Sequence, residues 1–564
     1  MKITETQTQT QTQIYRPSLL FLVIRNAYYV FLACIPLNVY SQKKIEIIKA
    51  GSLKFADNIA DGAKRLIGDV QFKHEDTFMY CDSAYFYSDN SLDAFGHIRI
   101  EQNDGVKLYG DFLKYSGIDK LAVIKKNVIF KKVDMELTTD VLNYDISTGI
   151  GYYNTSGRIV NKENILTSDR GSFYSKTNEF YFKKNVELTN PQFVINCDTM
   201  KYNTVTKITY FMGPTKIKSK ENLIYCEEGW YDTDNDLSRF YKNSYIISKE
   251  LKMIGDSLYY DRKQGIGKAF NNISIIDTVQ KLTINGDYAI HNEWNGVSII
   301  TGKALMMQRY ESDTLYLHAD TLKVVSFNPS QSQAVKQIKK ESPPKKKLGL
   351  KNKKQKKNKE LELPVIKESQ NTPEATKNYN QLFAYRKVKF FKNDLQGKCD
   401  SLSYNSIDSA MKMYGRPILW SEENQLTADS IKIHTGEKAI QAIELKSSGF
   451  IVSMEDSLHY NQIRGKYMKG YFKKNELYLI KVEGNGQTIY YATEKNKLKA
   501  VNRADCSNLN IYLEEKKMHH ITFITKPEAT LYPIEQIDPK EFKLKDFNWR
   551  GSERPLKMQD IFNW

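Results

Sequence analysis

One short phrase recurs in this chain at a fixed spacing of 29 residues. A small residue precedes an acid, an apolar residue stands two positions after the acid, and an aromatic residue stands four positions after it. Thr139, Asp140, Leu142 and Tyr144 are one copy. The acids of successive copies are Asp82, Asp111, Asp140, Asp169, Asp198, Glu227 and Asp256. A period of this length predicts a stack of similar structural units, each burying its apolar face against the next.

Each 29-residue repeat is predicted to form two strands joined by turns. Clusters of Asp, Asn, Gly and Pro fall every 14 or 15 residues, and such clusters mark the ends of strands. A straight strand of that length would be unusually long. Residues that permit a bend lie in the middle of every second predicted strand, at Gly96-His97, Lys126-Asn127, Lys184-Asn185, Gly213-Pro214 and Asn271-Asn272. Gly and Asn tolerate the conformations at which a strand bends, so we expect bent strands shared by two sheets.

Alternation of apolar and polar residues predicts one dry face on these strands. Stacking the units then aligns one column of aliphatic side chains and one column of tyrosines along a long apolar interior. We expect the candidate binding residues to be these: Leu113, Tyr115, Leu142, Tyr144, Met200, Tyr202, Leu258, Tyr260, Leu402 and Tyr404. Asn143 and Lys201, between the apolar positions, are expected to point outward.

The repeat continues beyond one large insertion. Asp287 and Asp320 extend the series at slightly longer steps, and Asp400 follows Asp320 by 80 residues, so one unit carries about 51 extra residues. We therefore predict a β array over residues 42–327, a Lys-rich disordered loop over 328–378 and a continuation of the array over 379–525. Residues 526–564 lose the pattern and gain prolines, and are predicted to be an irregular tail that caps the array or docks on a partner.

The first 41 residues have the order of a secretory signal. Arg16 and Arg25 precede an apolar run that ends in Val39-Tyr40-Ser41, which favours cleavage after Ser41. An uncleaved membrane anchor is the alternative, although Arg25 interrupts the apolar stretch. The signal predicts export.

The formal net charge of +17 is concentrated in one place. Residues 331–360 contain twelve Lys and two Glu, a net charge of +10. A lysine tract with Pro, Gln, Asn and Ser is typical of a solvated disordered loop, and contact with an acidic lipid or protein surface is the alternative. Export argues against nucleic acid as a partner.

The cysteines and acids that could act in catalysis or metal binding recur with the 29-residue repeat. Cys81, Cys197, Cys226 and Cys399 hold the position before the repeat acid, where other copies have Gly, Thr, Ser or Ala, so the position requires a small residue. The acids occur in every unit, which favours a local role, either turned to solvent or accepting N–H groups at the turn before the strand, over calcium binding or catalysis. We predict no catalytic residues, no metal and no cofactor. Gly484-Asn485-Gly486 is expected to be a turn between strands, because the third Gly of a dinucleotide loop is missing.

The motifs together resemble a known family. An export signal, units such as Gly255-Asp-Ser-Leu-Tyr-Tyr-Asp261, and the segments 464–470, 482–491, 502–505 and 526–533 are similar to the OstA/LptA group, and in particular to long OstA-like proteins of Bacteroidota-type bacteria. The resemblance covers most of residues 45–564 outside the lysine tract. The chain is longer than a short periplasmic carrier, and no outer-membrane barrel sequence follows the repeats.

The resemblance implies an all-β fold, an elongated two-sheet jellyroll of stacked bent strands that is open along one edge. It also implies a non-enzymatic periplasmic carrier or bridge that shelters the lipid A acyl chains of lipopolysaccharide on the way to the outer membrane. The implied partners are other jellyroll transport proteins at the inner or outer membrane, and further copies of the chain stacked end to end by strand addition. Two alternatives stay open: a structural or adhesive β-solenoid with a closed core, and a β-helical polysaccharide-acting enzyme.

Overall fold

A computed structural model describes residues 44–564 apart from 55–61, 75, 104, 133, 221, 249–250, 328–378, 437–438, 474–475, 495–496, 515–516 and 541. The predicted signal or anchor and the lysine tract lie outside the described residues. The chain divides into two compact units, Met1–Lys120 and Leu121–Trp564, which are treated separately below. No α-helix occurs among the described residues, and none of their helical turns is long and apolar enough to cross a membrane.

The first unit is built from six strands: β1 (Glu46–Lys49), β2 (Ser52–Lys54), β3 (Lys64–His74), β4 (Thr77–Phe86), β5 (Leu92–Gln102) and β6 (Lys107–Ser116). Strands β3 to β6 pair in sequence order, each antiparallel to the next. The short strands β1 and β2 pair with the two halves of β3 and form the edge of this unit.

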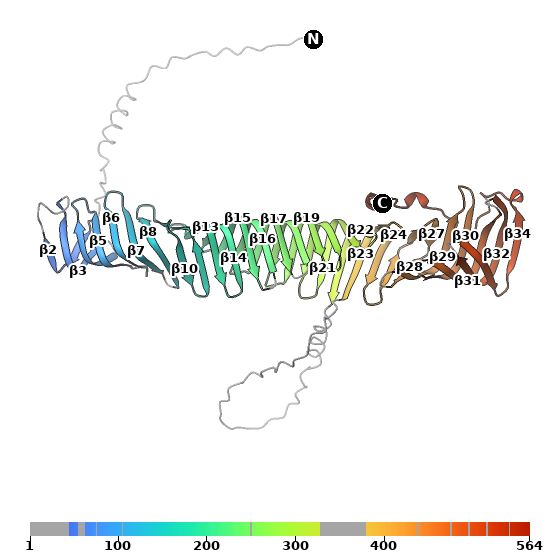
Figure 1. The fold of residues 1–564 in the computed structure, drawn as a ribbon, viewed down its shortest axis with the longest axis horizontal. Helices are drawn as coiled ribbons and strands as arrows, with labels where there is room; N and C mark the ends of the chain where they lie inside the picture. The colour runs from blue at the N-terminus through green and yellow to red at the C-terminus, as the bar shows by residue number, and fades with distance from the viewer. Residues whose placement is uncertain are drawn as a thin grey trace, which may run out of the picture. The chain divides into compact units, whose positions relative to one another are not determined.

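The second unit continues the same pattern (Figure 1). Its strands up to the lysine tract are β7 (Leu121–Lys132), β8 (Met135–Asp145), β9 (Ile150–Tyr153), β10 (Gly157–Asn161), β11 (Asn164–Ser168), β12 (Arg170–Tyr174), β13 (Glu179–Asn190), β14 (Phe193–Asn203), β15 (Ile208–Ser219), β16 (Asn222–Asp232), β17 (Leu237–Ser248), β18 (Leu251–Asp261), β19 (Ile266–Asp277), β20 (Leu282–Asn292), β21 (Val297–Arg309) and β22 (Thr314–Phe327).

After the tract come β23 (Tyr379–Lys392), β24 (Leu395–Asn405), β25 (Ala410–Tyr414), β26 (Ile418–Ser421), β27 (Asn424–Thr427), β28 (Ser430–Thr435), β29 (Ile440–Met454), β30 (Tyr460–Lys473), β31 (Glu476–Glu494), β32 (Lys497–Glu514), β33 (Lys517–Ile524) and β34 (Glu528–Pro533). Strands β22 and β23 pair directly, with Phe327 opposite Tyr379. The segment 328–378 therefore replaces a single turn between two neighbouring strands.

The long strands bend in the middle, as the sequence predicts. The register between neighbours shifts at one place in each strand, for example between Lys183 and Val186 of β13 and between Phe270 and Ile273 of β19. In alternate strands residues at this place have positive φ, as Asn271 (55°) and Asn272 (48°) of β19 and Gly213 (83°) of β15 do. Asn reaches this left-handed region more easily than most residues. Each bent strand thus has two limbs, and all-β stacking of bent antiparallel strands is confirmed.

The repeat acids lie at the same bend, on the neighbouring strand. Asn272 donates a hydrogen bond from Nδ2 to Asp256 Oδ2 at 2.8 Å, and Asn243 donates one to Glu227 Oε1 at 2.9 Å. In the first compact unit His97 Nδ1 lies 2.7 Å from Asp82 Oδ2. In these copies the acid therefore bonds to the left-handed pair in the middle of the neighbouring strand. Of the two expected alternatives, exposure to solvent is confirmed for most of the acids, among them Asp82, Asp140 and Asp256, and a role at the turn before the strand was wrong.

Two further expectations need correction. Gly484 and Asn485 do not form a turn between strands, because they lie inside β31 and supply its bend with φ values of 78° and 53°. All strand pairings among the described residues are antiparallel, as in β13 to β20. A parallel β-helix is therefore wrong for this chain.

The two limbs of the second unit carry different outer surfaces. We call the limb that ends in the repeat tyrosines the tyrosine limb, and the other the tail limb. The last 31 residues, with three short 3-10 turns (η2, Ile534–Gln536; η3, Gly551–Glu553; η4, Met558–Phe562), lie along the outer face of the tail limb from β32 back to β22. Residues 528–533, expected to be irregular, form β34 and pair with β32.

Candidate functional site

The inward side chains of the second unit are buried at the bend and more exposed toward the strand ends. Beside the bend, Leu142, Met200, Leu258 and Leu402 are each less than 8% exposed. Two residues further out on the same strands, Tyr144, Tyr202, Tyr260 and Tyr404 are half-buried. We call the buried row beside the bend, which includes the predicted aliphatic column, the floor of the interior. We call the strand ends beyond it, where the predicted tyrosine column lies, the mouth. In the first unit Leu113 and Tyr115 show the same contrast.

In the middle of the array the tyrosines have small cross-strand neighbours, whereas Tyr404 lies between Leu382 and Met411. Tyr202 lies opposite Thr209, Tyr231 lies opposite Thr209 and Ser238, and Tyr260 lies opposite Ser238 and Gly267. Small residues between the rings leave space for them to lie along the sheet. Where a Cβ is built on Gly151, its nearest side-chain atom belongs to the ring of Tyr144. Tyrosines spaced by small residues in this way give the sheet an aromatic inner face.

The tyrosine hydroxyls are anchored to acids of the turns. Tyr260 donates to Glu293 Oε2 at 2.8 Å, and Tyr231 donates to Asp236 Oδ1 at 2.6 Å. Burial raises the pKa of both phenols to about 12, the carboxylates add to this effect, and the neighbouring Arg262 guanidinium acts against it. The rings are therefore neutral at physiological pH, with their polar ends at the mouth and their faces toward the interior.

The tail limb supplies an aliphatic wall opposite the tyrosines. Its inward, half-buried side chains in β15 to β19 are Ile217, Ile224, Ile246, Met253 and Ile275. We did not predict these residues. In Ser244-Tyr-Ile-Ile-Ser248 apolar residues occupy both faces of the strand, so the alternation that would have identified Ile246 as inward is hidden in the sequence.

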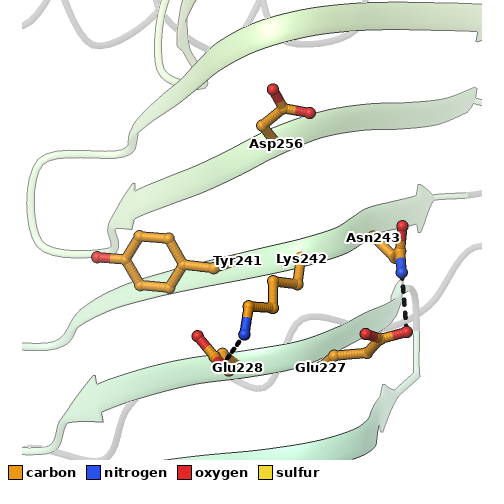
Figure 2. Close-up of a pocket in the computed structure, with 6 residues that line it drawn as sticks. All are labelled: Glu227, Glu228, Tyr241, Lys242, Asn243 and Asp256. Carbon is orange, nitrogen blue, oxygen red and sulfur yellow. Dashed lines mark hydrogen bonds and ion pairs between the residues drawn. The ribbon is translucent and has the colours of Figure 1, made fainter.

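A polar hollow lies on the outer surface, at the bend of β16 to β18 (Figure 2). Glu227, Glu228, Tyr241, Lys242, Asn243 and Asp256 line it, and its volume is about 600 Å³. Lys242 pairs with Glu228, and Asn243 donates to Glu227. These bonds belong to the repeated bend, so the hollow is a product of the fold. No group of three or more metal-ligand side chains occurs within the part of the chain that the structure describes.

The small residues before the acids point into the floor of the interior. Cys81, Cys197, Cys226 and Cys399 are free thiols and buried. Burial raises the pKa of each to about 12. A protonated, buried thiol is a weak nucleophile, so these cysteines act as small apolar side chains.

The comparison with family models agrees with the family resemblance. Residues 42–198 match the family model described as OstA-like protein, which confirms the resemblance over that part of the chain. No curated protein matches. One matching solved structure is LptH from Pseudomonas aeruginosa, described as the LptA-homologous periplasmic component of the lipopolysaccharide transport device. It is 13% identical, and the match covers 17% of this chain and 75% of LptH with a TM-score of 0.17.

Proposed function

From the match of residues 42–198 to the OstA-like family model, we propose that this chain is a periplasmic carrier or bridge for lipopolysaccharide. The apolar interior between the tyrosine limb and the tail limb shelters the lipid A acyl chains, and the sugars remain in water. The function requires no catalytic group, because burying an acyl chain is itself favourable by about 0.8 kcal/mol per CH₂.

The observation that supports this function is the pair of inward, half-buried apolar walls. A structural or adhesive solenoid needs its interior packed shut, since half-exposed tyrosine and isoleucine faces add nothing to its stability. Tyr231 and Tyr260 line one side, and Ile246 and Ile275 line the other. Apolar surface left accessible along an interior is typical of a ligand site.

The ends of the two units suit strand addition. Strands β1 and β2 have β3 as their described neighbour, and β33 and β34 have β32. An edge strand with one partner can accept another strand through its free backbone groups. We propose jellyroll transport proteins at the inner or outer membrane, or a second copy of this chain, as the partners at these edges.

A matched pair of substitutions tests the proposal. Ile275 points inward on β19 and Ile276, the next residue, points outward. We expect Ile275→Asp to weaken binding of purified lipid A at least tenfold, because a carboxylate then faces the acyl chains, while Ile276→Asp binds like the unaltered chain. Equal binding by both variants, each with an unchanged far-UV circular dichroism spectrum, would contradict the proposal.

A further inference from the structure

We propose that the segment β15–β19 of the second unit is an acyl-chain site and that the interior at β28–β32 is a closed core that admits no lipid. The groove is thus blocked toward the C-terminal end of this unit. This inference rests on the proposed function and defines where in the array that function is performed.

In the segment β15–β19 (Ile208–Asp277), which we call the open segment, the interior is accessible beyond the first row at the bend. Inward aliphatic side chains on the tail limb are half-buried, and so are the tyrosines that face them: Ile217, Ile224, Ile246, Met253, Ile275, Tyr231 and Tyr260. Several inward positions next to the bend are small, among them Cys226, Gly229, Ser244, Gly255 and Ala269. Larger buried side chains, Phe211, Phe240 and Leu258, lie beside them at the bend, so the accessible apolar surface of this segment belongs to the half-buried positions beyond the bend.

In the segment β28–β32 (Ser430–Glu514), which we call the closed segment, the equivalent tyrosine-limb positions of β28, β29, β31 and β32 are large and buried, and β30 has Gly470 in this row. Ile433, Ile443, Ile480 and Ile511 are 1%, 3%, 4% and 2% exposed. On the tail limb Ile451 is 8% exposed and Thr488 1% exposed, while Ile463 between them is half-buried. Side chains this inaccessible have protein atoms on every side, because interiors pack to near-crystalline density. These positions therefore leave almost no accessible apolar surface for a ligand.

The outer face of the closed segment is covered as well. Phe450, Val452, Ile489, Tyr491 and Val501 point away from the interior and pack beneath Leu544 of the C-terminal tail, together forming one buried cluster. Its partly buried members include Phe542, Phe547 and Trp549 of the tail. The closed segment thus has a core on each side of its tail limb. This arrangement holds the limb in place, whereas the described contacts of the C-terminal tail reach only as far as β23 and β22, outside the open segment.

The dimensions of the open segment suit an acyl chain. Five strands at about 4.8 Å spacing extend roughly 20 Å, and one leaflet of a bilayer, half of the hydrocarbon core, is about 15 Å thick. A saturated chain lying across the strands would contact aromatic rings on one side and aliphatic side chains on the other. Both surfaces exclude water, and the hydroxyls of Tyr231 and Tyr260 are already bonded to Asp236 and Glu293 at the mouth.

Site-specific photo-crosslinking in the full-length chain distinguishes the two segments. A photoreactive amino acid is placed singly at Ile246 or Met253 in the open segment, and at Ile443 or Ile480 in the closed segment. Ile247, outward on the same strand as Ile246, is the control for surface contact. Each purified variant is irradiated with lipid A in detergent micelles. Variants are compared only where the thermal unfolding midpoint stays within a few degrees of the unaltered chain.

We expect lipid adducts at positions 246 and 253 to exceed those at 443, 480 and 247 at least tenfold. Adducts of equal yield in both segments would overturn the closed core and leave the carrier function standing. Adducts in neither segment would overturn the carrier function and this inference with it. Because a bulky probe could force open a closed core, Ile443→Trp and Ile246→Trp supply a second measurement. The first should lower the unfolding midpoint without reducing lipid binding, and the second should reduce binding at an unchanged midpoint.

Discussion

At the scale of single residues, the bend depends on side chains that tolerate a left-handed backbone. Asn272 has φ of 48° and donates to Asp256. We expect Asn272→Val to lower the free energy of unfolding by about 1–2 kcal/mol, because a left-handed conformation costs a residue with Cβ branching at least that much. Asn272→Gly should lower it less. Chemical denaturation measures both.

The matched control is Ser274→Val on the same strand, two residues beyond the bend. Ser274 is paired in the regular ladder opposite Ile254, where valine is favoured. A loss of stability in Ser274→Val as large as that in Asn272→Val would show that the bend is not the cause.

The buried cysteines give a prediction about pH. Burial raises the pKa of Cys197 and Cys226 from 9.0 to about 12, so the folded chain favours the protonated thiol. Their contribution to stability is present below pH 9 and is lost as the pH rises from 9 toward 12. At pH 8 we expect both thiols to be unreactive toward a chromogenic disulfide reagent in the native chain and fully reactive in denaturant. Cys226→Ser identifies which thiol is followed, and rapid reaction of the native chain would contradict the burial.

At the scale of elements, the sequence predicts the bent strands because two independent signals coincide. The 29-residue period predicts two strands per repeat, and the Gly and Asn residues in the middle of every second strand predict the bend. The expected role of the acids at the turn before the strand was wrong because their partners, such as Asn272 for Asp256, lie 16 residues away and on another strand. The aliphatic wall was missed for a different reason: Ile246 and Ile247 are both apolar, and only the pairing register shows which faces inward. A single sequence contains no record of that register.

The C-terminal tail is held by three glutamines on the outer face of the tail limb. Gln425 donates from Nε2 to the carbonyl of Asn548 and accepts from the amide of Arg550, both at 2.7 Å. Gln396 and Gln462 also accept bonds from the tail, from Arg554 Nε and the Leu544 amide. Gln425→Leu leaves two tail backbone groups unpaired, and we expect it to lower the free energy of unfolding by about 1–3 kcal/mol. Limited proteolysis should then cut the tail sooner.

The control for the tail is Leu556→Ala. Leu556 lies on the same tail but is 76% exposed, so its removal should change neither stability nor cleavage. If Gln425→Leu and Leu556→Ala behave alike, the glutamine bonds do not hold the tail.

At the scale of the whole molecule, the insertion at 328–378 replaces one turn between paired strands. Phe327 and Tyr379 lie opposite each other in the ladder, so a short turn such as Asn-Gly can join them without moving either strand. We expect a chain in which residues 328–378 are replaced by such a turn to keep its unfolding midpoint and its affinity for lipid A. Loss of binding with an unchanged midpoint would assign the lysine tract to the lipid site.

Hydrogen exchange of the whole chain, with and without lipid, reports on both segments at once. Backbone amides of β28–β32 lie in a ladder buried on two sides and should exchange slowest in the free chain, since local opening there exposes two apolar cores. Amides of β15–β19 lie in a ladder whose backbone hydrogen bonds are equally continuous. The side chains of its interior are only half-buried, so these amides should exchange faster.

Lipid A bound between the limbs fills that interior, so protection should rise in β15–β19 and stay constant in β28–β32. Ile275→Asp should abolish the rise, while Ile276→Asp should retain it. Protection that rises equally along the second unit would mean that the lipid occupies its full length.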